Sequence, residues 1–270
     1  MKPRHALAVM AATLLASAAP AAPAPAVPDT VDQGALVVAR VAPGSRVQVG
    51  GRDVRVAPDG TFVFGVARDA TGHVPVKVTA PDGTVAWDSP AVAPRDWGLE
   101  VIEGVPPATV DPPREVAERI AREAAAVAAA RTRDEARTDF ARGFQWPVRG
   151  RISGRFGSGR VYNGRAGGGH SGMDIAAAQG TPVLAPAGGV VAFAGDLYIT
   201  GGTVLLDHGH GVGSNFLHLS RIDVAVGDTV EQGQPIGLVG ATGRATGPHL
   251  HWGMTWFDVR VDPERQLPGT

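Results

Sequence analysis

The most constraining feature of the sequence is its texture from residue 144 onward, where glycine recurs and the apolar runs are short. Many of these runs are β-branched, as in T-P-V-L-A-P, G-V-V-A-F-A-G, G-T-V-L-L-D-H and H-L-H-W-G-M-T-W. Short β-branched runs between glycine turns are typical of antiparallel strands, and no long amphipathic helix fits between them. We therefore predict that residues 144–270 form an antiparallel β-sheet domain with Gly-rich loops.

A second, smaller set of strand patterns occupies residues 35–105. The runs A-L-V-V-A-R, S-R-V-Q-V-G, D-V-R-V, T-F-V-F-G-V and V-P-V-K-V-T-A are short, several alternate with a period of two, and turns such as Pro58-Asp59-Gly60 interrupt them. These patterns predict a small β-rich domain. His73 stands alone in a turn there, and we expect it to be a solvated loop residue.

Residues 106–143 read as a linker followed by a helix. Asp111 is a candidate N-cap, and residues 114–142 are rich in Ala, Arg and Glu without Gly or Pro, so we predict a helix that ends at Gly143. Its apolar stripe is thin, which suits a helical spacer. The predicted fold class is therefore mainly β, with a small β domain and a connecting helix ahead of the C-terminal domain.

The first residues resemble an export signal. A basic start precedes an apolar run, and small residues follow. This is the three-part pattern of a secretory signal peptide over residues 1–22, cleaved after Ala18 or Ala22, with an uncleaved anchor as the alternative. Residues 23–34 form an Ala/Pro-rich lead-in. We expect an exported protein, periplasmic or associated with the cell envelope, without a membrane span in the mature chain.

Composition excludes several classes of function. The formal net charge is −1 and no basic block stands out, which argues against a nucleic-acid partner. The chain has no cysteine, so disulfides, thiolate metal sites and a cysteine nucleophile are ruled out. The oligomeric state is left open.

Side chains with metal-binding chemistry gather in the C-terminal domain, where six of the eight histidines fall between positions 170 and 251. The candidates are His170 and Asp174 in G-H-S-G-M-D, His249 and His251 in G-P-H-L-H-W, and His218 in N-F-L-H-L-S. Histidine is the commonest zinc ligand, and a mixed set of His and Asp ligands suits a catalytic zinc that keeps one position open. The alternative is that these histidines are structural or surface residues that bind no metal.

The local patterns indicate how these residues are presented. If the run at His249 and His251 is a strand, both imidazoles lie on one face and Leu250 lies on the other. Glycines around His170 oppose a helix there, so we expect a loop that enters a strand at residues 173–175.

A general base is missing from its usual place in zinc peptidases. The H-E-x-x-H motif is absent, and the glutamates after Trp146, Glu231 and Glu264, are not near a histidine in sequence. Proton transfer would then fall to histidines that are not metal ligands. His208 and His210, in L-D-H-G-H-G, are expected to be turn or rim residues rather than ligands.

Several motifs together resemble one known family. H-S-G-M-D-I, F-L-H-L-S, V-G-D-T-V-E-Q-G-Q-P-I-G and G-A-T-G-R-A-T-G-P-H-L-H-W follow the opening F-Q-W-P-V-R-G-R-I-S-G-R-F-G. Over residues 144–263 this set resembles the lysostaphin-type (LytM-like) zinc metalloendopeptidases of peptidoglycan. The resemblance implies that Zn²⁺ is held by His170, Asp174 and His251. It implies that His218 and His249 are catalytic, as the base and as the stabiliser of the tetrahedral oxyanion.

Two functions are therefore expected to compete. The first is a secreted zinc-dependent endopeptidase that cuts peptidoglycan cross-links or stem peptides with zinc-activated water and histidine acid/base assistance. The second is a non-catalytic cell-wall binding or hydrolase-activator protein that retains the fold. All the expected positions are filled, which favours the enzyme. We expect the loop at residues 163–169 to shape the substrate groove, and a chain starting near Phe144 to contain the complete core and metal site.

Overall fold

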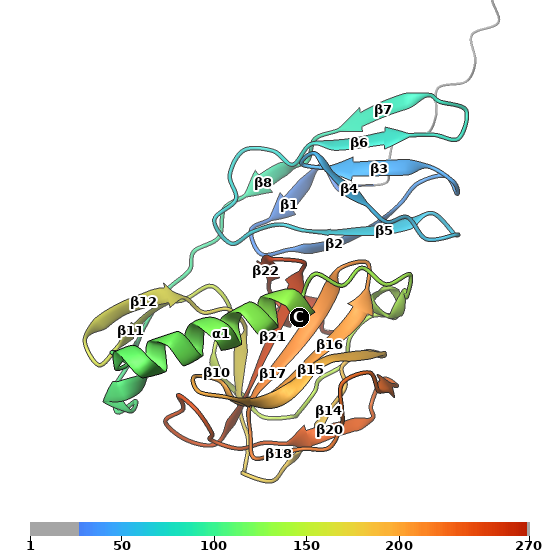
Figure 1. Cartoon of the computed structure of the whole chain (residues 1–270). Helices are drawn as coiled ribbons and strands as arrows, with labels where there is room; N and C mark the ends of the chain where they lie inside the picture. The colour runs from blue at the N-terminus through green and yellow to red at the C-terminus, as the bar shows by residue number, and fades with distance from the viewer. Residues whose placement is uncertain (1–26, 269–270) are drawn as a thin grey trace, which may run out of the picture.

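The computed structural model describes residues 27–268, which form two β units joined by a connector that carries one α-helix (Figure 1). The predicted class, mainly β with antiparallel sheets and one helix, is confirmed. The predicted signal peptide and residues 23–26 of the lead-in lie outside the described residues. No helix in the described part of the chain is long and apolar enough to cross a membrane.

The front unit is built from short strands: β1 (Thr30–Asp32), β2 (Leu36–Arg40), β3 (Arg46–Val49), β4 (Arg52–Val54), β5 (Thr61–Gly65), β6 (Val76–Thr79), β7 (Val85–Asp88) and β8 (Ala91–Ala93). They form a four-stranded sheet in the order β4-β3-β6-β7, an antiparallel pair β2-β5 and a parallel pair β1-β8. Phe62 and Phe64 are fully buried at its centre. His73 is exposed, as the sequence predicts.

The connector leaves the front unit through β9 (Leu99–Ile102) and the short 3₁₀ helix η1 (Pro107–Thr109), then enters α1 (Arg114–Ala130) and a second 3₁₀ helix, η2 (Asp139–Arg142). The half-buried side chains of α1 include Val116, Ile120 and Val127, the predicted apolar stripe. In Figure 1 this green helix lies across strands β15 to β17 of the C-terminal unit.

Two details of the predicted helix are wrong. The N-cap is Pro113 and not Asp111, and no side chain caps it. The helix ends at Ala130, well before Arg142, because the next residues find partners elsewhere. Asp134 binds Arg55 of the front unit, and the carbonyl of Glu135 accepts a bond from the His210 amide of the C-terminal unit. These tertiary bonds replace further turns of helix.

The C-terminal unit contains most of the strands: β10 (Arg151–Gly154), β11 (Gly159–Tyr162), β12 (Arg165–Gly169), β13 (Met173–Ala176), β14 (Pro182–Leu184), β15 (Gly189–Leu197), β16 (Gly201–Gly209), β17 (Val212–Leu219), β18 (Arg221–Ile222), β19 (Thr229–Val230), β20 (Pro235–Leu238), β21 (His249–Trp256) and β22 (Val259–Val261), followed by the 3₁₀ helix η3 (Glu264–Gln266). The eight-stranded sheet runs β10-β13-β21-β17-β16-β15-β19, with β22 on β21.

Residues 163–169, predicted as a loop, instead complete a hairpin. Asn163 and Gly164 form the turn between β11 and β12, and both have positive φ. The strand β9 of the connector pairs in parallel with β11, so the small sheet runs β12-β11-β9. The connector is therefore part of the sheet structure of the C-terminal unit and not a free spacer.

The core of the C-terminal unit lies under β21. Leu250, Trp252 and Met254 alternate along this strand and are all fully buried. Because side chains alternate between the two faces of a strand, this burial fixes the direction of the intervening histidines. The front unit packs against the C-terminal unit where β5 contacts β21 and β22. Arg95 also forms an ion pair with Asp262, whose side chain is 3% exposed.

Candidate metal centre and active site

Three polar side chains converge on one point in the C-terminal unit: His170, Asp174 and His251. His170 Nε2 lies 3.1 Å from Asp174 Oδ1 and 3.0 Å from His251 Nδ1, and the last two atoms are 2.8 Å apart. All three residues are buried. Ligands of a tetrahedral zinc stand about 3.3 Å apart when the bonds are about 2.0 Å long, so the triangle has nearly the size of a metal site.

Strand register brings two of these groups together. Asp174 on β13 is the direct antiparallel partner of His251 on β21, so both side chains leave the sheet at the same place. His170 lies in the loop before β13, and the chain passes close to β21 at Gly172. A Cβ atom there would lie 2.7 Å from His251 Nε2 and 2.5 Å from the Trp252 carbonyl oxygen. Glycine in H-S-G-M-D is therefore needed for this approach.

The hydrogen bonds and pKa shifts of these three side chains favour the binding of a cation. His170 Nδ1 donates to the carbonyl of Arg155 at 2.9 Å, so the Nε2 of the neutral ring offers a lone pair to the centre. Burial opposes ionisation of Asp174, but its contacts with His170 and His251 hold the pKa of that carboxyl well below its usual range. Burial lowers the pKa of His251 to about 4. Two imidazole nitrogens and a carboxylate thus face one point, a donor set that fits Zn²⁺ with one position open.

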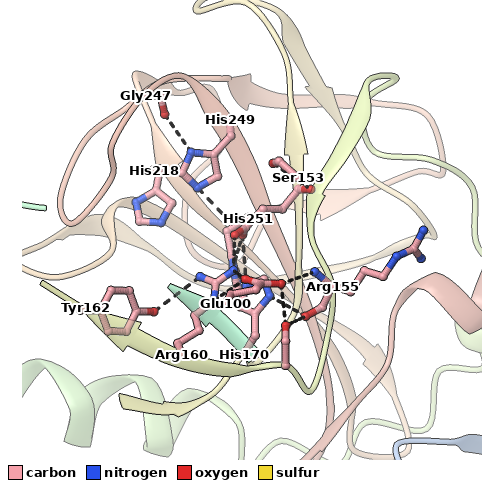
Figure 2. Close-up of polar contacts among 12 residues, drawn as sticks. Glu100, Ser153, Arg155, Arg160, Tyr162, His170, His218, Gly247, His249 and His251 are labelled. Carbon is pink, nitrogen blue, oxygen red and sulfur yellow. Dashed lines mark hydrogen bonds and ion pairs between the residues drawn. The ribbon is translucent and has the colours of Figure 1, made fainter. Parts of the chain in front are cut away.

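Two further imidazoles stand beside this group, His218 at the end of β17 and His249 at the start of β21. Their ring centroids are 4.8 Å apart, and Figure 2 shows both rings next to His251. His218 Nδ1 donates to the Thr242 carbonyl at 2.8 Å, and His249 Nδ1 donates to the Gly247 carbonyl at 2.8 Å. Each ring is therefore anchored through Nδ1, and Nε2 of His249 faces the centre, 3.9 Å from Asp174 Oδ1.

His218 is held in an unusual state. Its backbone φ is +66°, a left-handed conformation that is strained for a residue with a side chain. Burial, and then the neighbouring rings of His249 and His251, lower the pKa of His218 to about 3. At neutral pH this imidazole is neutral and can accept a proton.

A cleft runs across the five side chains. A cavity of about 230 Å³ is lined by all five and also by Ile102, Tyr162 and Arg244. A second cavity of about 420 Å³ shares Arg160, Asp174 and His249 with the first and continues on the other side of them. The centre therefore lies where two cavities meet.

Other residues at the centre were not predicted from the sequence. Arg160 Nη2 donates to Asp174 Oδ2 at 2.6 Å, and Arg160 is also paired with Glu100 of β9 at 3.0 Å (Figure 2). No spacing pattern links Glu100 to the histidine motifs. Only the parallel pairing of β9 with β11, which sets Glu100 opposite Arg160, brings them together.

The predicted placement on a turn or rim is wrong for His208 and correct for His210, which lies in the turn between β16 and β17. His208 is fully buried at the end of β16, where its Nδ1 lies 2.6 Å from the Gly188 carbonyl and its Nε2 lies 2.8 Å from Ser214 Oγ. His210 is also buried and packs on Phe140. Strand pairing on both sides of β16 places His208 within the sheet. Neither residue belongs to the His/Asp/His group found among the described residues.

Comparisons with known proteins agree with this site. Residues 168–263 match the family described as Peptidase family M23. A crystal structure of a Pseudomonas aeruginosa protein assigned to peptidase M23 is 34% identical, with 86% of this chain and 92% of that chain covered and a TM-score of 0.68. The fold and the site therefore define a metallopeptidase of the M23 type.

Curated relatives match part of the chain. DD-carboxypeptidase/endopeptidase Mpg of Neisseria meningitidis serogroup B is 49% identical over 83 residues, which is 31% of this chain and 19% of that protein. Peptidoglycan DD-endopeptidase ShyA of Vibrio cholerae serotype O1 is 46% identical over 83 residues, again 31% of this chain and 19% of that protein. The match thus spans about a fifth of these relatives. The chain belongs to peptidase family M23, and the resemblance to the LytM-like group is confirmed.

Proposed function

We propose that the protein is a zinc-dependent endopeptidase that hydrolyses peptide bonds in bacterial cell-wall peptidoglycan. The observation that carries this proposal is the convergence of His170 Nε2, Asp174 Oδ1 and His251 Nδ1 within 3.1 Å of one another, beside two anchored imidazoles. Membership of peptidase family M23 and relatives named as DD-endopeptidases of peptidoglycan support the same activity.

In this proposal His170, Asp174 and His251 hold the zinc. When bound, the ion would supply Lewis-acid chemistry, which acidifies a water molecule and polarises the carbonyl of the scissile peptide. The chain keeps the ligands ready for that task. Arg155 fixes the tautomer of His170 through its carbonyl, and Arg160 occupies the outer oxygen of Asp174, so that Oδ1 points to the centre.

His218 and His249 would handle protons. Each has Nδ1 committed to a backbone carbonyl, so each can accept or donate a proton only at Nε2. A ring that is neutral at working pH suits a base that takes the proton of the attacking water. A ring that then carries a proton donates a hydrogen bond to the developing oxyanion. The assignment of one ring as the base and the other as the oxyanion stabiliser follows the family resemblance.

The cleft also carries a cation for the substrate. The Arg244 guanidinium lies 4.4 Å from the centroid of the Tyr162 ring and donates to the Thr109 carbonyl, so no carboxylate of the described residues matches its charge. Arg244 lines the same cavity as His218 and His249. Peptidoglycan stem peptides carry free carboxylates, and a positioned guanidinium binds such groups in a bidentate manner. We assign Arg244 to substrate binding.

The proposal also covers where the protein acts and whether it is catalytic. We infer export to the periplasm or cell envelope, supported by the signal-like first residues and by a substrate that lies outside the cytoplasm. The alternative, a non-catalytic hydrolase activator with this fold, is less well supported, because all five polar side chains of the site are present and oriented.

Digestion of purified peptidoglycan tests the proposed function. The full mature chain should release fragments whose masses, measured by liquid chromatography and mass spectrometry, identify one type of cleaved peptide bond. A chelator should stop the release, and added Zn²⁺ should restore it. Release of fragments that is unaffected by a chelator, or no release with zinc fully bound, would overturn the proposal.

A further inference from the structure

The connector strand β9 places a carboxylate next to the metal centre from outside the catalytic segment. Glu100 Oε1 accepts bonds from the Arg155 amide at 3.2 Å and from Ser158 Oγ at 2.6 Å. Glu100 Oε2 accepts a bond from Arg160 Nε at 3.1 Å and lies 3.0 Å from Arg160 Nη2. One side chain thus ties together both ends of the segment 155–160.

That segment supplies the outer partners of two proposed zinc ligands. The carbonyl of Arg155 accepts the proton of His170 Nδ1 at 2.9 Å. Arg160 Nη2 donates to the outer oxygen of Asp174 at 2.6 Å. Backbone hydrogen bonds also hold this segment against His170: the His170 amide donates to the Ser158 carbonyl, and the Gly157 amide donates to the His170 carbonyl, both at 2.8 Å. Without Glu100, residues 155–160 would still contact His170 and Asp174, but they would lose the carboxylate that holds the Arg155 amide, Ser158 and Arg160 in position.

The local packing is built around these contacts. The Arg160 side chain is 10% exposed and the Asp174 side chain is 11% exposed, so their pair is largely shielded from water. A Cβ atom on Gly154 would lie 2.5 Å from Arg160 Nη2 and 2.8 Å from Asp174 Oδ2, so glycine at this position leaves the space that the pair occupies. A buried guanidinium between two carboxylates loses much of its compensation when either one is removed.

We propose that Glu100 is a positioning residue for the metal centre. It acts through Arg155 and Arg160, which hold His170 and Asp174, and it is supplied by the connector that links the front unit to the C-terminal unit. This inference rests on the proposed zinc site. It means that the catalytic centre is incomplete in the segment 168–263 that defines the family, and that residues ahead of Phe144 contribute to zinc affinity.

The substitution Glu100→Gln in the full chain tests this inference. Gln keeps the size of the side chain but loses its charge, and its amide cannot accept all the bonds that the carboxylate accepts. We expect zinc affinity, measured by competition with a chromophoric chelator, to fall by about 10-fold to 100-fold, the usual cost of losing an outer partner of a metal ligand. With Co²⁺ in place of zinc, the visible absorption bands should change in intensity, because the ligand geometry changes.

Glu103→Gln is the matched control, because Glu103 follows on the same connector and is exposed. Its zinc affinity and cobalt spectrum should equal those of the wild type. Circular dichroism of the metal-free proteins checks that each variant is folded. If Glu100→Gln does not fold, Ser158→Ala removes one donor to Glu100 and should still weaken zinc binding by about threefold or more.

The outcomes separate this inference from the proposed function. A wild-type chain that binds no zinc would reject the proposed function itself. A wild-type chain that binds zinc, together with a folded Glu100→Gln variant of unchanged affinity and unchanged cobalt spectrum, would reject only the role of Glu100. An equal loss of affinity in Glu103→Gln would also reject it, because the effect would then be one of net charge.

Discussion

Asp174 and His251 are direct partners on neighbouring antiparallel strands, and Oδ1 of Asp174 lies 2.8 Å from Nδ1 of His251. The register of the sheet therefore sets the distance between two proposed ligand atoms. Because strand pairing restricts both side chains, the site depends on the fold as well as on the identity of its ligands.

Replacement of a proposed ligand should remove zinc. We predict that His170→Ala, Asp174→Ala and His251→Ala each bind zinc at least about 100-fold more weakly and lose peptidoglycan hydrolysis, because a site with three protein ligands depends on each of them. Elemental analysis after dialysis measures the metal. His73→Ala, an exposed histidine of the front unit, is the control and should keep full zinc. Full occupancy in any of the three ligand variants would reject that assignment.

Replacement of the two anchored imidazoles should separate metal binding from turnover. We predict that His218→Ala and His249→Ala retain stoichiometric zinc, while kcat falls by about 10²-fold to 10⁴-fold, the range typical of a lost general acid or base. Metal content and initial rates on the same protein samples check both parts. A variant that cleaves peptidoglycan at nearly the wild-type rate would show that its histidine has no such role.

Arg244 should affect substrate binding more than chemistry. We predict that Arg244→Ala raises KM for a carboxylate-bearing stem peptide by about 10-fold, the cost of a lost charge-assisted contact, while zinc content is unchanged. Arg149→Ala is the matched control, since Arg149 also stacks on an aromatic ring, that of Trp146, but does not line the cleft. An equal KM for the acid and amide forms of the peptide in the wild type would contradict this role.

His208 should make the fold sensitive to acid. Trp252 Nε1 donates to Ser214 Oγ, which can then donate to His208 Nε2, and His208 Nδ1 donates to the Gly188 carbonyl. Only a neutral ring satisfies this chain, and burial lowers the pKa of His208 to about 4 from 6.5. The folded pKa is below the unfolded one, so the unfolded chain takes up the proton first. Stability is then complete above about pH 6.5 and is lost as the pH falls toward about 4.

Urea denaturation in a chelator measures this effect. Between about pH 7.5 and about pH 5, His208 should account for a loss of about 2 kcal/mol in the free energy of unfolding. His208→Gln should be less stable at neutral pH but should lose correspondingly less between the two conditions. The same pH dependence in both proteins would show that another group is responsible.

Shortened chains test the contribution of the connector. A chain that starts at Phe144 keeps the three proposed zinc ligands but lacks Glu100 and α1, so it tests the expectation that such a chain contains the complete metal site. We predict that it binds zinc about 10-fold or more weakly than the full mature chain. A chain that starts at Pro94 keeps β9 and should recover most of the affinity. Circular dichroism establishes that both are folded, and equal zinc affinity of the two shortened chains would contradict the prediction.

Sequence periodicity was sufficient for the local parts of the site. A strand period of two places His249 and His251 on one face with Leu250 buried behind them, and this follows from backbone geometry alone. Glycine near His170 excluded a helix for the same local reason, and β13 begins where the sequence predicts it. The motifs then identified the family, because they hold the residues that this chemistry requires.

Other features depend on contacts between distant segments, which no local pattern encodes. The sequence places His208 on a turn or rim, but strand pairing on both sides of β16 buries it within the sheet, whereas His218 lines the cleft. The helix ends at Ala130 because Asp134 and Glu135 bind groups far along the chain. The sequence by itself determined most of the strands, the family and the residues with ligand chemistry. The tertiary structure decided that Glu100 reaches Arg160, because strand pairing between β9 and β11 is set by the packing of the whole chain.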